Sequence, residues 1–305
     1  MRTETQNLGY TKKLCILPFD HRSYFEQLLG FAEPLTAEQK SQLSDYKKIV
    51  FEGFEQSLSQ GVSRDDAAVL IDDVFGLDLL LEAKQKGYTI LQSTEISGID
   101  HFEFEHGADW KTWIEKVKPT FTKVLLRYNV EGDTALNQKS LLNLKELSDY
   151  SHQQGYKFLI ELLVPPTASQ TNSVGQDKQK YDHELRPALT VRAMKEMQDA
   201  GIEPDVWKIE GMYTTEAYQN IVLAATRDGR NNVGTVSLGR NETDDVVELW
   251  LTTGAQVPGI IGFAVGRTVF LNALLSYRKG DMTREEAVEE IAERYAHFYQ
   301  VFNSK

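Results

Sequence analysis

Short apolar runs alternate along the chain with longer segments in which apolar residues recur at helical spacing. Eight of the runs have the length and composition of strands buried on both faces, at 14–19, 68–71, 89–92, 123–128, 157–163, 206–209, 233–238 and 260–265. Helical patterns lie between and after them, at 37–59, 77–86, 110–117, 139–154, 187–200, 216–227, 244–253, 269–277 and 284–302. Eight alternating units predict a parallel (β/α)8 barrel, the TIM barrel. The alternative, an open doubly wound sheet, seldom supplies eight evenly spaced units.

The last helical pattern adds a C-terminal helix to the predicted barrel. Its apolar positions fall on one stripe: Val288, Ile291, Ala292, Tyr295, Phe298, Tyr299 and Phe302. We expect this stripe to pack on the outside of the barrel; a homo-oligomer interface is the alternative. No Pro/Gly/Ser-rich linker divides the chain, so residues 1–305 are predicted to form one domain.

The connection 165–186 is long and polar and follows the fifth predicted strand. Connections of this length in compact domains are often lids or disordered segments. We expect it on the face of the barrel where the strands end, which is where barrel enzymes place their active sites.

Composition narrows the class of protein. The net charge of −12 argues against a general binder of nucleic acid or membrane surfaces, which needs a basic face. No run approaches a membrane span, and residues 1–6 lack the apolar core of a signal peptide. Cys15 is the only cysteine, so no disulfide framework or cysteine-rich zinc site is expected. These features favour a cytoplasmic protein.

Lys208 is the most informative residue of the chain, because it lies inside the short apolar run 206–209. A buried amine is costly unless it has a function. Strand alternation places Glu210 on the same side as Lys208. A desolvated lysine beside a carboxylate is the arrangement that makes an amine nucleophile, able to form a Schiff base with a ketone.

Charged residues also end or occupy most of the other strands. They are Asp20, His21, Arg22, Asp72, Asp73, Lys123, Arg127, Glu161, Glu210, Arg240 and Arg267. Any one of them could belong to a structural ion pair. Lys123 has three possible roles: it could be the nucleophile itself, a ligand-binding residue, or a helper. As a helper, its positive charge would lower the pKa of the Lys208 amine. We favour Lys208.

Two glycine–arginine pairs follow the seventh and eighth predicted strands, Gly239-Arg240 and Gly266-Arg267. Glycine allows a ligand to approach the backbone amides, and arginine offers a bidentate fork for phosphate. These two loops are the usual phosphate site of this fold. We therefore expect a phosphorylated small molecule as ligand.

No metal or cofactor is predicted. The six histidines form no HxH or HExxH pattern, and GxGxxG and Walker sequences are absent. His101 and His106 lie five residues apart in an acidic stretch, for which a solvated loop is a better interpretation than a metal site.

Four motifs together resemble the DUF2090 domain. They are Phe-Asp-His-Arg at 19–22, Lys-Ile-Glu at 208–210, Leu-Gly-Arg at 238–240 and Gly-Phe-Ala-Val-Gly-Arg-Thr at 262–268. In some inositol-catabolism proteins that domain follows a sugar kinase and is assigned as 5-dehydro-2-deoxyphosphogluconate aldolase. More distantly, the chain is similar to class I tagatose-bisphosphate aldolases. This sequence carries no kinase domain, and Leu-Gly-Arg-Asn at 238–241 is typical of the stand-alone branch.

The resemblance implies a class I aldolase that needs no metal. It implies a Schiff base on Lys208, phosphate binding by Gly239, Arg240, Gly266 and Arg267, and a pocket lined by Asp20, Glu161 and Lys123. Glu161 is our first choice for the base and Asp20 the second, and His21 and Arg22 are expected to receive the carboxylate or aldehyde end of the substrate. Two alternatives remain: an isomerase or epimerase in which Lys208 acts without an imine, and a non-catalytic sugar-phosphate-binding barrel.

Overall fold

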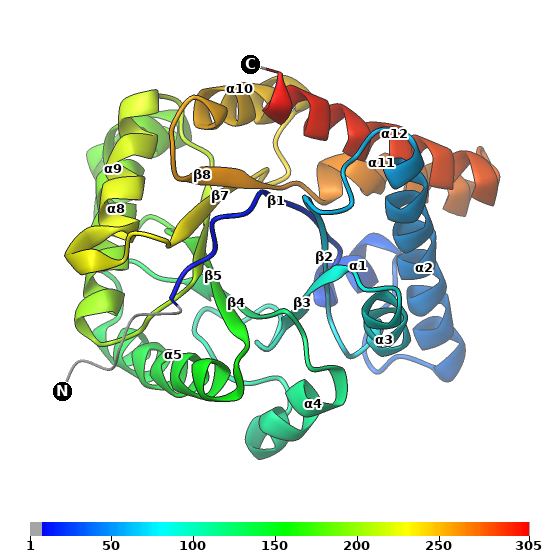
Figure 1. Ribbon diagram of the computed structural model, residues 1–305, viewed down its shortest axis with the longest axis horizontal. Helices are drawn as coiled ribbons and strands as arrows, with labels where there is room; N and C mark the ends of the chain where they lie inside the picture. Colours follow the sequence, from blue (N-terminus) through cyan, green and yellow to red (C-terminus); the bar gives the residue numbers. More distant parts are fainter. Residues whose placement is uncertain (1–7, 305) are drawn as a thin grey trace.

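In a computed structural model, which describes residues 8–304, eight parallel strands close into a barrel in the order of the sequence (Figure 1). The strands are β1 (Leu14–Pro18), β2 (Ala67–Ile71), β3 (Thr89–Ser93), β4 (Phe121–Arg127), β5 (Lys157–Leu163), β6 (Val206–Glu210), β7 (Gly234–Leu238) and β8 (Ile260–Ala264). All eight predicted strands are present, with ends that differ by at most two residues. The predicted (β/α)8 fold is therefore confirmed; the N-terminal stretch examined for a signal peptide lies outside the described residues.

Helices surround the barrel as an outer ring (Figure 1). They are α1 (Ser23–Leu28), α2 (Ala37–Ser59), α3 (Leu77–Gln85), α4 (Trp110–Val117), α5 (Thr134–Gln154), α6 (Ala168–Ser173), α7 (Lys178–Lys180), α8 (Arg186–Asp199), α9 (Thr215–Ala225), α10 (Asp244–Ala255), α11 (Arg267–Lys279) and α12 (Arg284–Asn303). The larger core lies between this ring and the sheet.

The interior of the barrel has an apolar floor with a charged layer above it. The floor is a separate cluster of buried side chains that includes Phe121, Leu159 and Val206. Because side chains alternate across a strand, the next inward positions of these three strands are two residues further on. They are occupied by Lys123, Glu161 and Lys208. The alternation of side chains along the strands thus places two lysines and a carboxylate directly above the apolar floor, away from water.

Strand register brings these groups together. Glu161 of β5 pairs with Lys208 of β6. On the other side Glu161 pairs with Leu125 of β4, two residues beyond Lys123. The stagger of a closed barrel therefore places Glu161 between the two lysines.

The connection 165–186 contains helical structure, which corrects the expectation of a disordered segment; the alternative of a lid stays a prediction. It folds into α6, α7 and one π-helical turn (Tyr181–Leu185) that runs into α8. α6 begins with a capping box at Thr167, and Asn129 donates to Gln170 at 2.7 Å. The hydroxyl of Tyr181 donates to the carbonyl oxygen of Val164 at 2.7 Å. The polar composition of the segment had suggested a loop. Its polar side chains instead form hydrogen bonds with one another and cap the ends of short helices.

α12 packs along α2 and α11, as expected (Figure 1). It begins at a capping box formed by Thr283 and Glu286. Its apolar stripe is buried against the barrel, and Tyr295 reaches the carbonyl oxygen of Cys15 at 2.6 Å. The stripe is thus covered within the chain, so it does not support the alternative of a subunit interface.

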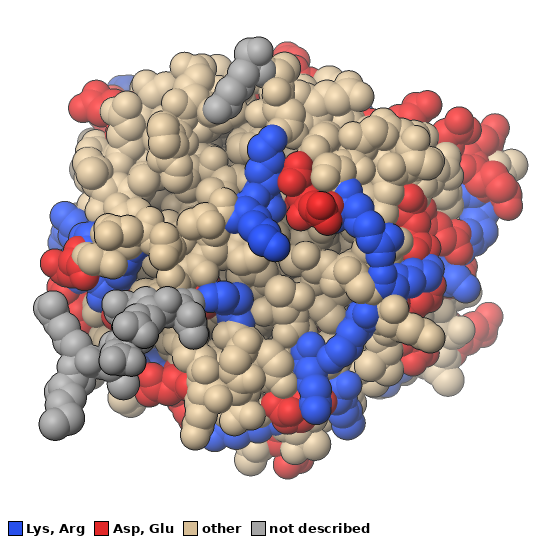
Figure 2. Space-filling model, viewed as in Figure 1, with Lys and Arg blue, Asp and Glu red and all other residues tan. Residues whose placement is uncertain are grey.

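The face drawn in Figure 2 carries lysine and arginine side chains near its middle, interspersed with acidic side chains that continue to the edge. It is not a continuous basic surface of the kind that nucleic-acid binding requires. No helix within residues 8–304 is long and apolar enough to cross a membrane.

Candidate active site

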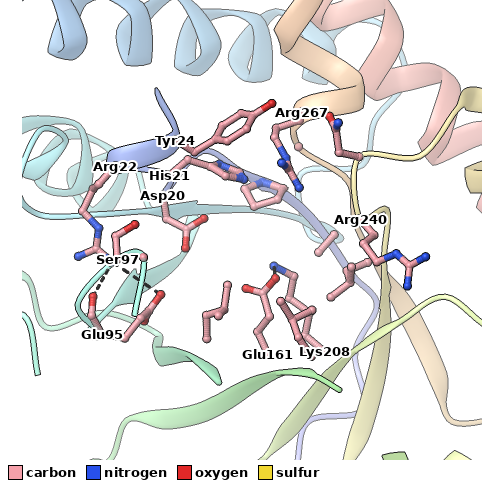
Figure 3. Close-up of a pocket in the computed structure, with 18 of the residues that line it drawn as sticks. Asp20, His21, Arg22, Tyr24, Glu95, Ser97, Glu161, Lys208, Arg240 and Arg267 are labelled. Atoms are coloured by element: carbon pink, nitrogen blue, oxygen red, sulfur yellow. Dashed lines mark hydrogen bonds and ion pairs between the residues drawn. The ribbon is translucent and has the colours of Figure 1, made fainter. Parts of the chain in front are cut away.

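A cavity of about 240 Å³ opens where the strands end. Its walls come from the ends of β1, β3, β4, β5, β6, β7 and β8 and from the loops that follow them. Of the ten residues predicted for the site, nine line this cavity: Asp20, His21, Arg22, Glu161, Lys208, Gly239, Arg240, Gly266 and Arg267. The tenth, Lys123, lies beneath them and is fully buried. Figure 3 shows Lys208 and Glu161 side by side at the bottom of this view.

The amine of Lys208 is only 3% exposed, and its Nζ lies 2.7 Å from Oε1 of Glu161. Burial lowers the pKa of Lys208, the contact with Glu161 opposes that effect, and the charge of Lys123 lowers the pKa further. The net direction is below the ordinary range for lysine. The carboxylate beside Lys208 is therefore Glu161, whereas Glu210, which the sequence suggested, contacts Arg240 at 2.9 Å.

Lys123 has a different environment, because three carboxylates surround its amine. Its Nζ lies 2.7 Å from Asp20, 2.7 Å from Glu95 and 3.0 Å from Glu161. Burial alone would lower the pKa of Lys123, but these three charges outweigh it and raise the pKa. Lys123 is thus held as an ammonium ion, which has no lone pair to attack a ketone.

The carboxylates of Asp20 and Glu161 remain charged because lysines lie beside them. Burial alone would raise the pKa values of both groups. The charge of Lys123 opposes this effect at Asp20, and the charges of Lys208 and Lys123 oppose it at Glu161. Both pKa values are lowered as a result. Glu161 bridges the two lysines, so a proton that leaves Lys208 has an acceptor in direct contact.

Two of the predicted ligand-binding arginines already have carboxylate partners. Arg22 contacts Glu105 at 2.9 Å and the carbonyl oxygen of Glu95 at 2.5 Å. Arg240 contacts Asp182, Glu210 and Glu242, and its guanidinium points away from Lys208 in Figure 3. These contacts compensate the charges of the two guanidinium groups, so Arg22 positions the loop after β3 and Arg240 ties β7 to the segment 165–186.

Arg267 is in the opposite situation. Within residues 8–304 no carboxylate lies at ion-pair distance from its guanidinium, which stacks on the ring of Tyr24 with 4.6 Å to the centroid. In Figure 3 its nitrogens point into the cavity. Arg267 is also the first residue of α11, so the positive end of that helix dipole faces the same space.

The glycines beside these arginines serve packing more than ligand approach. A Cβ on Gly266 would lie 2.3 Å from the carbonyl oxygen of Pro18, so only glycine lets β8 end against β1. On Gly239 it would meet Val265 at 3.3 Å, which is tight but less severe. Both glycines also line the cavity, so their predicted part in phosphate binding stays a prediction.

His21 lies among Tyr24, Phe25 and Phe270 on the cavity wall. Burial lowers its pKa to about 3, and Arg267, Lys47 and Lys208 add to that effect against the charge of Asp20. The ring is therefore neutral at pH 7. Its Nδ1 is buried and has no partner among the described residues.

Sequence reasoning missed two cavity residues and one supporting residue. Glu95 and Ser97 follow β3 and line the cavity; Arg127, which ends β4 and also lines it, had been noted among the charged strand residues without a role. Asp182, in the π-helical turn, holds Arg240. The polar Ser-Thr-Glu after the third strand was a usable signal for Glu95, since every other strand end was read in that way. Nothing in the polar segment 165–186 distinguished Asp182.

Other charged residues that the sequence singled out lie outside the cavity. Asp72 pairs with the buried Lys47 at 2.6 Å, and Asp73 pairs with His106 at 2.9 Å. His101 contacts Glu103 at 2.6 Å. In the part of the chain that the structure describes, no group of three histidine, cysteine or acidic side chains is arranged to hold a metal ion.

The fold and this cluster of two lysines and three carboxylates define a (β/α)8 barrel with a desolvated amine at its open end. The chain belongs to the DUF2090 family, described as uncharacterized protein conserved in bacteria, whose model matches residues 1–305. No curated protein matches it.

Similar solved structures share the fold at low identity. A fructose-bisphosphate aldolase from Slackia heliotrinireducens is 15% identical with a TM-score of 0.54, covering 98% of this chain and 87% of that one. An archaeal fructose 1,6-bisphosphate aldolase is 13% identical with a TM-score of 0.53, covering 94% and 95%. A Corynebacterium glutamicum protein is 16% identical with a TM-score of 0.56, covering 96% and 87%.

Proposed function

We propose that this protein is a class I aldolase that cleaves a phosphorylated keto sugar or sugar acid through an imine on Lys208. The observation that supports this most is the contrast between the two lysines of one cluster. Burial and the charge of Lys123 lower the pKa of Lys208, whereas three carboxylates raise that of Lys123. One amine is thus prepared to be a nucleophile, and the other supplies a fixed positive charge.

The first half of the reaction makes the imine. The lone pair of Lys208 Nζ adds to the ketone carbon, and the former carbonyl oxygen takes up a proton from solvent to become a hydroxyl. The nitrogen loses a proton to Glu161, which lies 2.7 Å away. The same carboxylate returns a proton to the hydroxyl of the addition product, which leaves as water. The protonated imine that results is the electron sink for cleavage.

The second half breaks the carbon–carbon bond. A carboxylate, Glu161 first and Asp20 second, removes the proton of the β-hydroxyl group. The O–H electron pair becomes the new aldehyde C=O, and the C–C pair moves to the imine to form an enamine. Protonation of the enamine carbon and addition of water then release the ketone product and free Lys208.

Arg267 is the residue we assign to the substrate phosphate. It is the cavity arginine without a carboxylate partner among the described residues, and the N-terminus of α11 adds its dipole. The family resemblance makes 5-dehydro-2-deoxygluconate 6-phosphate the first substrate to test, with dihydroxyacetone phosphate and malonate semialdehyde as its products.

The test is a comparison of turnover by Lys208→Met and Lys123→Met with the wild type. Methionine nearly preserves the volume of lysine and removes the amine. Lys208→Met should lose about three orders of magnitude or more in cleavage rate while circular dichroism shows a folded protein. An isomerase that works without an imine would convert ketose phosphates with no aldehyde released. A non-catalytic binding barrel would turn over no member of a ketose phosphate panel.

A further inference from the structure

Four arginines line the cavity, and they divide into two kinds. Arg22 and Arg240 are paired with carboxylates, as described above. Arg127 and Arg267 are not neutralised in this way. Among residues 8–304 the one carboxylate within ion-pair distance of Arg127 is Asp100, at 4.0 Å, and its side chain is 87% exposed. One Arg127 nitrogen also donates to the carbonyl oxygen of Ile99 at 3.2 Å, which holds the side chain without cancelling its charge.

The strand pattern explains why Arg127 faces the cavity. On β4 the inward positions are Phe121 in the floor, Lys123 in the charged layer, then Leu125 and Arg127. Four residues of strand carry Arg127 roughly 13 Å beyond Lys123 along the chain. It therefore stands at the rim of the cavity, above the reacting layer.

The topology places Arg127 opposite Arg267. Arg127 ends β4 and Arg267 follows β8, and in a closed barrel of eight three strands lie between these two on either side. Lys208, on β6, lies midway around the wall between them. A linear ligand with its phosphate at Arg267 and its ketone at Lys208 has its other end directed toward β4.

We propose that Arg127 forms a second anion subsite that selects substrates with a negative group at the end remote from Arg267. Ser97, Gly98 and Ile99 complete its wall, and the Ser97 hydroxyl lies 3.0 Å from that of Ser23. This subsite rests on the proposed function for its place in the reaction, where it receives the aldehyde half of the cleaved substrate. It replaces His21 and Arg22 in that role, since His21 is neutral and Arg22 is paired.

A binding experiment tests the subsite without requiring catalysis. The probes are a hexitol 1,6-bisphosphate and the matching hexitol 1-phosphate, which have no carbonyl group and cannot form an imine. Isothermal titration should show the wild type binding the bisphosphate about tenfold more tightly than the monophosphate. Arg127→Gln should remove that preference and leave monophosphate binding unchanged. Arg267→Gln should weaken both probes.

Arg192→Gln is the matched control, because Arg192 forms an exposed ion pair with Glu131 outside the cavity. It should bind both probes as the wild type does. Equal affinities of the wild type for the two probes would overturn the subsite, as would an unchanged preference in Arg127→Gln. Borohydride trapping of an imine on the same proteins reports on the aldolase separately. If trapping fails while the Arg127-dependent preference holds, the subsite stands and the aldolase does not.

Discussion

At the scale of single residues, the site depends on how charges compensate one another. Lys208 and Lys123 are both buried in the same cluster, yet one has one carboxylate neighbour and the other has three. Since burial acts on both amines, the number of neighbouring carboxylates decides that the pKa of Lys123 is raised and that of Lys208 is lowered. The number of neighbouring carboxylates also distinguishes the two arginines: Arg240 has three, whereas Arg267 has none at ion-pair distance among the described residues.

Replacing Arg267 with alanine should weaken binding of a phosphorylated substrate. A charge-assisted hydrogen bond contributes roughly 1.5–3 kcal/mol, and partial exposure of Arg267 places the effect near the lower value, about tenfold. Lysine at this position should recover only part of the loss, because it keeps the charge without the fork. KM should be compared for the phosphorylated and dephosphorylated substrate. An equal loss for both would mean that Arg267 supports the fold or the chemistry.

The stability of the protein should depend on His21 in mild acid. The folded-state pKa of about 3 lies below the value of about 6.5 expected in the unfolded chain. Between these values the unfolded chain binds more protons, so the free energy of unfolding falls as the pH decreases below about 6.5. His21→Gln should remove this dependence, by at most about 2 kcal/mol at pH 5. Urea titrations at pH 7 and pH 5 measure it; equal losses in both proteins would contradict the neutral, buried ring.

At the scale of elements, one arginine joins the segment 165–186 to the ends of two strands, in addition to the contacts of Gln170 and Tyr181. Arg240 contacts Asp182 of the π-helical turn, Glu210 at the end of β6 and Glu242 after β7. Asp182 also binds Arg186 at 2.9 Å, at the start of α8. Three elements therefore meet at one guanidinium, and π-helical turns are frequent at functional sites.

Removing this arginine should loosen the segment more than it harms the barrel. Breaking a fully buried charge pair costs about 3–5 kcal/mol, and the partial exposure of Arg240 reduces that to roughly 1–3 kcal/mol. In Arg240→Gln, amide hydrogen exchange should accelerate within 165–186 while the strands keep their protection. Lys145→Gln, which breaks an exposed pair with Asp149, is the control. Unchanged exchange in the segment would show that other contacts hold it.

At the scale of the whole molecule, the apolar packing and the candidate active site lie at opposite ends of the barrel axis. An apolar floor fills the end where strands begin, the charged layer lies on it, and the cavity opens above. Strand periodicity was enough to predict this arrangement, because alternation and strand count determine which residues face inward. The eight strands, Glu161 and Lys208 could be placed from the sequence for that reason, whereas the other seven cavity residues were placed by their position just after a predicted strand.

The pairing of charges could not be predicted in the same way. Which carboxylate reaches Lys208 depends on the stagger between β5 and β6, and no sequence pattern records that stagger. Arg240 looked equivalent to Arg267 because both follow a glycine at a strand end. Their difference arises from Asp182, which lies 58 residues from Arg240 in a segment that composition had marked as a loop.

Cleavage activity should survive treatment with EDTA. The three carboxylates that converge at the bottom of the site already have the Lys123 ammonium as their shared ion-pair partner, and the protonated imine serves as the electron sink. Turnover should be measured before and after chelation and again after zinc is added. Activity that disappears with EDTA and returns with zinc would contradict the imine mechanism.

The most direct measurement is the site of imine formation. Borohydride added with dihydroxyacetone phosphate should reduce the imine, so that the intact protein gains the mass of one ligand less one oxygen atom, which leaves as water. Peptide mapping should locate that adduct on Lys208, and Lys208→Met should gain no mass. An adduct on Lys123, or no adduct on a folded wild type that cleaves its substrate, would contradict the assignment of Lys208 as the nucleophile.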